Sequence, residues 1–90
     1  MDYSFSKRDN NNRSTLTING SKVGRVHFRE YDAWLNPYET NRLKSKEDLE
    51  RLGITVEYSS NDYVGTAKLF IDSTDEEKIA TILAKAFRDV

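Results

Sequence analysis

The chain has 90 residues, no cysteine, one histidine and a formal net charge of −1. A chain of this length is expected to form a single domain over residues 1–90, near the lower size limit for folding without staples. Without cysteine it can form no disulfide, thiolate metal site or cysteine nucleophile, so we expect stability from apolar packing and a reducing cytoplasm as its location.

Charge is unevenly distributed along the chain. Residues 1–29 contain six basic and two acidic side chains, whereas residues 30–62 contain four basic and eight acidic ones. This asymmetry either marks a contact with nucleic acid or an acidic protein, or reflects two regions that face each other in the fold. The N-terminus lacks the apolar run of a secretory signal, and no stretch reaches the roughly 18 apolar residues of a membrane span. We therefore expect no membrane contact.

Alternating apolar and polar residues predict the strands. Residues 1–13 are expected to be either a flexible basic arm or an edge strand, since Tyr3 and Phe5 alternate with polar residues before a turn at Asp9-Asn10-Asn11-Asn12. Four further stretches alternate in the same way. Their apolar positions are Leu16 and Ile18; Val26 and Phe28; Ile54, Val56 and Tyr58; and Ala67, Leu69 and Ile71.

A stretch with the sequence AWLNPYETNRL lies between the second and third of these sets and is predicted to be an insert outside the sheet. Pro37 resembles the first turn of a helix, so the region up to Leu52 is predicted as one kinked helix or two short ones. Ser45 and Asp48 are the cap candidates of its second part, and Gly53 is expected to stop it. Trp34 and Tyr38 either anchor this insert onto the core or project from it as an interface hot spot.

The last helix is predicted after Thr74, which forms a capping box with Glu77 ahead of apolar residues at helical spacing. The element order indicates an α+β fold, in which an antiparallel sheet of four or five strands has two helical regions packed on one face. A duplicated β-β-α unit is also suggested, because Val23-Gly24 aligns with Val64-Gly65 at an offset of 41 positions.

The register of the first hairpin decides where its charged side chains point. A two-residue loop at Asn19-Gly20 would pair Leu16 with Val23 and place Arg25 on the core side. Burying an unpaired charge costs several kcal/mol. We therefore predict a three-residue loop, which pairs Leu16 with Gly24 and leaves the charged side chains on the open face.

The second hairpin is predicted to have a four-residue loop over residues 59–62 that pairs Tyr58 with Tyr63. With both helices on the apolar side, the opposite face of the sheet is expected to be open, polar and partly basic. Phe70 on that face can act as a stacking platform or a protein-binding anchor. The predicted binding residues are Arg25, His27, Arg29, Tyr31, Trp34, Tyr38, Lys68 and Phe70.

No catalytic set is recognised in the sequence. His27 is the only histidine and is predicted to be a surface residue without a metal or catalytic role. The four dispersed glycines form no phosphate-binding loop. The acidic cluster of Asp72, Asp75, Glu76 and Glu77 is explained by helix capping. We expect no enzymatic activity, no cofactor and no metal.

The sequence favours a small intracellular protein-binding or inhibitory module that occludes a partner's surface, as many regulatory and mobile-element proteins do, including phage inhibitors of host systems. It would use the open face, the insert or an edge strand. The alternative is nucleic-acid binding by the basic, aromatic-containing face. The isoelectric point of about 5.8 argues against this alternative, because nucleic-acid-binding domains are usually strongly basic. A homodimer joined through sheet faces or edges is a third hypothesis.

Overall fold

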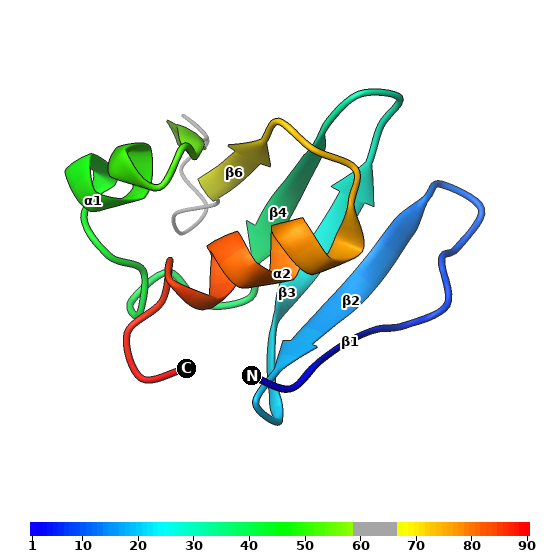
Figure 1. The fold of residues 1–90 in the computed structure, drawn as a ribbon, viewed down its shortest axis with the longest axis horizontal. Helices are drawn as coiled ribbons and strands as arrows, with labels where there is room; N and C mark the ends of the chain where they lie inside the picture. The colour runs from blue at the N-terminus through cyan, green and yellow to red at the C-terminus, as the bar shows by residue number, and fades with distance from the viewer. Residues whose placement is uncertain (59–66) are drawn as a thin grey trace.

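The computed structural model describes residues 1–58 and 67–90 and has an α+β fold (Figure 1). One antiparallel sheet has the strand order β1-β2-β3-β4-β6-β5. The strands are β1 Tyr3–Phe5, β2 Arg13–Ile18, β3 Ser21–Phe28, β4 Ala33–Pro37, β5 Thr55–Tyr58 and β6 Ala67–Ile71, and the helices are α1 Lys46–Arg51 and α2 Glu76–Ala84. The predicted class is confirmed, but the sheet has six strands rather than four or five.

The strand that the sequence reading missed is β4, which lies in the middle of the sheet between β3 and β6. Its residues alternate in burial, with Ala33, Leu35 and Pro37 on the core side and Trp34 and Asn36 half-buried. The prediction of a helix that begins at Pro37 was therefore wrong. Proline is tolerated here because it is the last residue of the strand, where it interrupts little of the ladder.

The first hairpin turns through two residues, not three. Ile18 pairs with Ser21, and both Asn19 and Gly20 have positive φ angles of 50° and 83°, as a type I′ turn requires. The register then shifts between Leu16 and Thr17, so that Leu16 pairs with Gly24 after all. The bulge thus leaves the charged side chains on the open face by a route different from the predicted loop.

The second hairpin also has a register different from the predicted one. Tyr58 pairs with Ala67 instead of Tyr63, a slip of four positions. An even slip keeps each side chain on its face, so Val56 still lies on the core side, opposite Leu69. The predicted loop over residues 59–62 lies outside the described residues.

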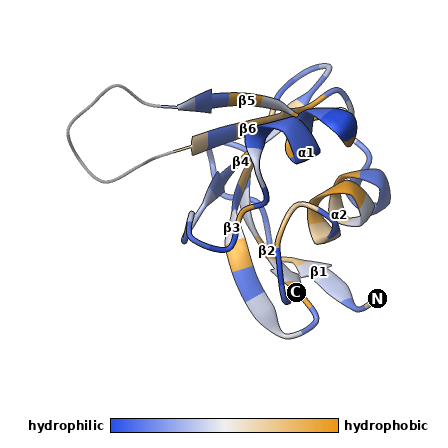
Figure 2. Cartoon of the chain, turned by 90° about the vertical axis from the view of Figure 1, so that its left-hand side faces the viewer, coloured by the Kyte–Doolittle hydropathy of each residue, from blue (hydrophilic) through white to orange (hydrophobic). Residues whose placement is uncertain are grey.

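Both helices pack on the same side of the sheet (Figure 2). The cap of α1 is Ser45, one of the two predicted candidates, since it accepts a hydrogen bond from the Asp48 backbone at 3.2 Å. In α2 the cap is Asp75 instead of Thr74, because the Asp75 carboxylate accepts from the backbone of Lys78 at 2.8 Å. No helix in residues 1–58 and 67–90 is long and apolar enough to cross a membrane.

The core fills the space between the sheet and the two helices. Its fully buried leucines come from three strands and both helices, namely Leu16, Leu35, Leu49, Leu69 and Leu83. The N-terminal segment joins this body through edge strand β1 and through Arg8, whose guanidinium lies 3.7 Å from the Phe28 ring and 3.2 Å from Glu76. In chain order a hairpin precedes each helix, with β4 added to the first unit, and the duplication stays a prediction.

Candidate functional site on the open face of the sheet

Side chains of five strands form a straight line across the face of the sheet that lies opposite the helices. Strand pairing places Arg13 beside His27, His27 beside Trp34, Trp34 beside Phe70, and Phe70 beside Thr55. Paired residues in antiparallel strands share a face, so this order follows from the register. We call His27, Trp34 and Phe70 the aromatic row.

The three rings of the aromatic row cover one another. The imidazole of His27 is stacked on the indole of Trp34, with the ring centroids 3.7 Å apart and the planes within 6°. The ring of Phe70 is tilted by 36° to the indole, and the centroids of the two rings are 6.1 Å apart. All three side chains are half-buried although no described helix lies over them. The stacked rings therefore offer solvent their edges more than their faces.

Basic side chains border the aromatic row. The Lys68 ammonium lies 4.7 Å from the centroid of the Trp34 ring, and the Arg29 guanidinium lies 5.2 Å from that of Phe70, both within the range of cation–π attraction. Arg29 is also held by Asp32, its Nε donating to a carboxylate oxygen at 2.6 Å. The face consequently combines an apolar centre with a cationic border.

Two of the border cations form ion pairs with described residues and two do not. The carboxylate of Asp9 accepts from the Arg13 side chain at 2.9 Å, just as Asp32 pairs with Arg29. Arg25 and Lys68 form no ion pair with any other described residue. Lys68 lies opposite Glu57 in the pairing of β5 with β6, whereas the cross-strand neighbours of Arg25 are the uncharged Thr15 and Asn36.

The protonation state of His27 follows from this neighbourhood. Partial burial lowers the pKa of its imidazole, and the positive charges of Arg13, Arg25 and Lys68 lower it further against the smaller opposing effect of Asp9. The imidazole is therefore neutral at pH 7 and behaves as a third aromatic ring of the row. In residues 1–58 and 67–90, no group of three His, Asp or Glu side chains is placed to hold a metal ion.

Four of the predicted binding residues gather around Trp34: Arg25, His27, Lys68 and Phe70. The predicted placement of Trp34 in an insert outside the sheet was wrong, because Trp34 is a strand residue at the centre of the sheet. Its role as an interface hot spot stays a prediction. Tyr38 is exposed at the end of β4, with its hydroxyl 3.2 Å from that of Thr15. Tyr31 is 79% exposed in the turn after β3 and lies outside the row.

Sequence reasoning missed two residues of this face. Arg13 was assigned to the basic N-terminal arm, but it lies in β2 beside His27. Asn36 was assigned to a helix start, but it pairs with Arg25. The alternation of Ala33, Leu35 and Pro37 with Trp34 and Asn36 was the only sign of a strand in the sequence, and the proline obscured it.

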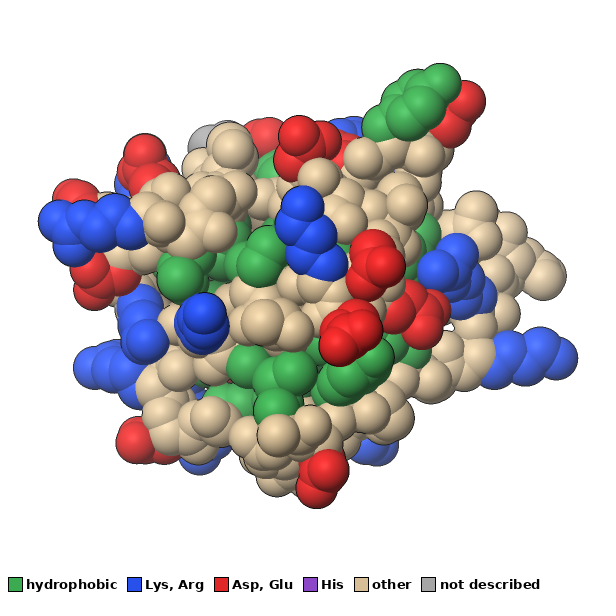
Figure 3. All heavy atoms as spheres, viewed as in Figure 1, with side chains coloured by type: hydrophobic (Ala, Val, Ile, Leu, Met, Phe, Trp, Pro, Cys, Tyr) green, Lys and Arg blue, Asp and Glu red, His purple; other side chains and the backbone are tan. Residues whose placement is uncertain are grey.

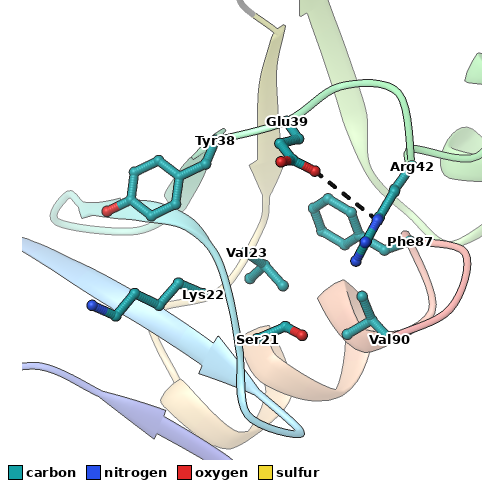
Figure 4. A pocket seen from close by; sticks show the side chains of 8 residues that line it. All are labelled: Ser21, Lys22, Val23, Tyr38, Glu39, Arg42, Phe87 and Val90. Atoms are coloured by element: carbon teal, nitrogen blue, oxygen red, sulfur yellow. Dashed lines mark ion pairs between the residues drawn. The ribbon is translucent and has the colours of Figure 1, made fainter.

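The helix side of the molecule has a different character. Figure 3 shows acidic side chains near the N-terminal end of α2 and no histidine on this side. A hollow of about 370 Å³ lies beside the C-terminal segment, floored by Val23 and Phe87 (Figure 4). Glu39 and Arg42 are paired at its rim with a 4.0 Å separation, and Tyr38 also lines it.

Comparison with protein-family models, curated proteins and solved structures finds no match to this chain. Its function is therefore argued from its own geometry.

Proposed function

We propose that the chain is a non-enzymatic, cytoplasmic binding module that occludes a surface of a partner protein with the open face of its sheet. The observation that carries this proposal is the aromatic row, a half-buried apolar centre surrounded by charged side chains. Binding energy at protein interfaces is concentrated in aromatic and arginine residues at the centre of a patch, within a polar rim that excludes water. Occlusion by one rigid face suits a small inhibitor, such as those encoded by phages.

The charges of the border indicate the chemistry of the partner. Arg25 and Lys68 flank the aromatic row and form no ion pair with other described residues, and Arg25 has no carboxylate among its cross-strand neighbours. Complementary charges across an interface accelerate association and reject wrong partners. The partner surface is therefore an apolar patch edged by carboxylates.

Nucleic-acid binding is the second candidate, because aromatic and basic residues on an open sheet are the elements of single-strand recognition. Two features favour protein over nucleic acid. One face of the Trp34 indole is already covered by His27, so a base cannot stack there without displacing the imidazole. Arg13 and Arg29 are each paired with an aspartate, which reduces the charge available to phosphates.

The test compares two double charge reversals in a capture experiment from lysate of the source cell. Arg25→Glu/Lys68→Glu changes the open face, and Lys78→Glu/Lys85→Glu makes the same charge change at exposed positions on the helix side. A protein captured by the wild type and by the α2 variant should be lost with the open-face variant. With the partner purified, we expect at least about a tenfold loss of affinity. Equal capture by all three proteins would refute the proposal.

Side-chain truncation provides a second arm. Trp34→Ala and Phe70→Ala should weaken binding by about 2 kcal/mol or more if these rings are the hot spot, whereas Tyr31→Ala should change little. Circular dichroism must show that each variant remains folded. A folded Trp34→Ala protein that binds as tightly as the wild type would exclude the aromatic row as the contact.

The nucleic-acid alternative is tested with the same open-face variant. Labelled single- and double-stranded oligonucleotides are titrated with the protein at two salt concentrations. Micromolar binding that weakens steeply with salt and disappears in Arg25→Glu/Lys68→Glu would favour nucleic acid as the ligand, because phosphate neutralisation releases counterions.

A further inference from the structure

The edge strand β5 is paired on one side only. All four of its residues pair with β6, from Thr55 opposite Phe70 to Tyr58 opposite Ala67, and its outer side has no described partner. It contains neither proline nor lysine, which are common devices for protecting an edge. No strand in residues 1–58 and 67–90 pairs with the outer backbone groups of β5.

A hollow and a projecting side chain lie at opposite ends of this strand. The hollow, of about 390 Å³, is lined by Lys46, Glu50, Gly53, Ile54, Thr55 and Val56. Tyr58 is 58% exposed and lies on the same face of the strand as Val56, because side chains alternate along a strand. The same strand therefore has a hollow at its start and the projecting side chain of Tyr58 at its end.

We infer that two copies of the chain join through β5, antiparallel, about a two-fold axis at Val56. In this register Val56 lies opposite Val56 of the second copy, and Thr55 lies opposite Glu57. Tyr58 of each copy then lies beside Ile54 of the other, at the hollow between β5 and α1. A two-fold interface must be complementary to itself. This register meets that requirement, because Tyr58 of each copy lies at the hollow of the other.

The charges support this register. An axis at Glu57 would also keep the faces of the two sheets aligned, but it would place two Glu57 carboxylates directly opposite each other, which is destabilising. An axis between two residues would turn the core face of one copy toward the open side of the other.

The joined molecule would have one continuous sheet with both aromatic rows on the same side. The inference does not depend on what the open face binds, because β5 pairing uses the edge and the helix side. It concerns the assembly of the chain and can fail or hold independently of the proposed function.

Sedimentation equilibrium over a concentration series tests the assembly. The wild-type mass should rise from 10.4 kDa toward twice that value. Tyr58→Glu should weaken association at least tenfold, and Tyr31→Glu, an identical change at another exposed tyrosine, should associate as the wild type does. A wild type that remains monomeric throughout, or a folded Tyr58→Glu variant that associates equally well, would overturn the inference. A monomer would leave the β5 edge to a strand from a different protein.

The natural absence of cysteine permits a direct test of the register. Thr55→Cys and Glu57→Cys proteins are oxidised separately and as an equal mixture. Because Thr55 faces Glu57 of the second copy, the mixture should give more disulfide-linked dimer than either variant alone. Efficient cross-linking of Glu57→Cys to itself would place the axis at Glu57 and contradict the proposed register.

Discussion

The His27 imidazole shows how neighbours decide the role of a side chain. Its ring is parallel to the Trp34 indole, and three basic side chains surround it. Stacking removes the ring from water, and the surrounding charges penalise the imidazolium, so both effects favour the neutral form. The same contacts that build the aromatic row therefore make its integrity dependent on pH.

We predict that acidification destabilises the fold through His27. The pKa of His27 is lowered in the folded state from its usual value of 6.5, so the unfolded chain binds the proton more readily. Stability should be full above about pH 7 and decline as the pH falls through 6.5 toward the folded-state pKa. Thermal unfolding midpoints of the wild type and of His27→Gln, measured from about pH 8 to about pH 5, test this.

The paired aspartates do not interfere with this measurement, because they lose their effect at lower pH. Hydrogen bonds from Arg13 and Arg29 lower the pKa values of Asp9 and Asp32, whose stabilising effect is lost only as the pH falls below 3.8. A wild-type midpoint that falls between pH 7 and 5 no more than that of His27→Gln would contradict the prediction about the imidazole.

Gly24 is a second position where local geometry sets a strict requirement. A Cβ atom there would lie 2.4 Å from the backbone oxygen of Asn36 and 2.9 Å from Pro37 Cα, so β3 and β4 would have to separate. We predict that Gly24→Ala costs about 2 kcal/mol or more, measured by chemical denaturation.

Gly20→Ala is the matched comparison. Gly20 has open space around it but a φ of +83°, so its substitution should cost only the backbone strain of about 1 kcal/mol. A smaller loss at Gly24 than at Gly20 would mean that the two strands adjust to the added methyl group.

At the scale of elements, patterns confined to a few neighbouring residues were predicted well and pairings between distant ones were not. Ser45 and Gly53 were correctly placed at the ends of α1, and the turn at Asp9 forms as expected, with the Asp9 carboxylate accepting from the backbone of Asn11 at 2.8 Å. The bulge near Leu16 and the register of Tyr58 depend on packing across the whole sheet. Local sequence does not contain that information.

The open face was largely predicted because strand periodicity assigns side chains to faces regardless of strand order. Arg25, His27, Lys68 and Phe70 were therefore placed together correctly. Trp34 was not, since the proline that ends β4 and the tyrosine after it are typical of a helix start. The pairing of AWLNP with β3 on one side and β6 on the other is visible only in the structure.

The cap of α2 gives a prediction at this scale. Asp75, not Thr74, accepts the hydrogen bond from the Lys78 backbone, and a lost N-cap costs about 1 kcal/mol. Asp75→Ala should therefore lower the free energy of unfolding by about that amount, and Thr74→Ala should leave it nearly unchanged. Urea denaturation of both variants measures the difference. The reverse order would restore Thr74 as the cap.

At the scale of the whole molecule, stability is expected to decrease from the centre of the sheet to its edges. Strands β2, β3, β4 and β6 each have strand neighbours on both sides, whereas β1 and β5 each have one. Residues such as Val26, Leu35 and Leu69 in the central strands are fully buried. The edges are therefore the regions most able to open without global unfolding.

Native-state hydrogen exchange tests this gradient. Amides of β3, β4 and β6 should exchange only by global unfolding, and those of β1 and of the six-residue helix α1 should exchange through local opening at lower free energy. Measurements above and below the dissociation range would also show whether β5 gains protection from association. Protection of β1 equal to that of β3 would contradict the gradient.

The position of β4 has a consequence for biosynthesis. In the sheet β4 lies beside β6, although α1 and β5 separate them along the chain. A nascent chain therefore leaves the ribosome with β4 as an unprotected edge, and this edge closes only when Ala67–Ile71 has been made. Helix α2, which packs on β2, follows later still. Because β4 is completed only by a strand made later, folding is expected to be slow for a domain of this size.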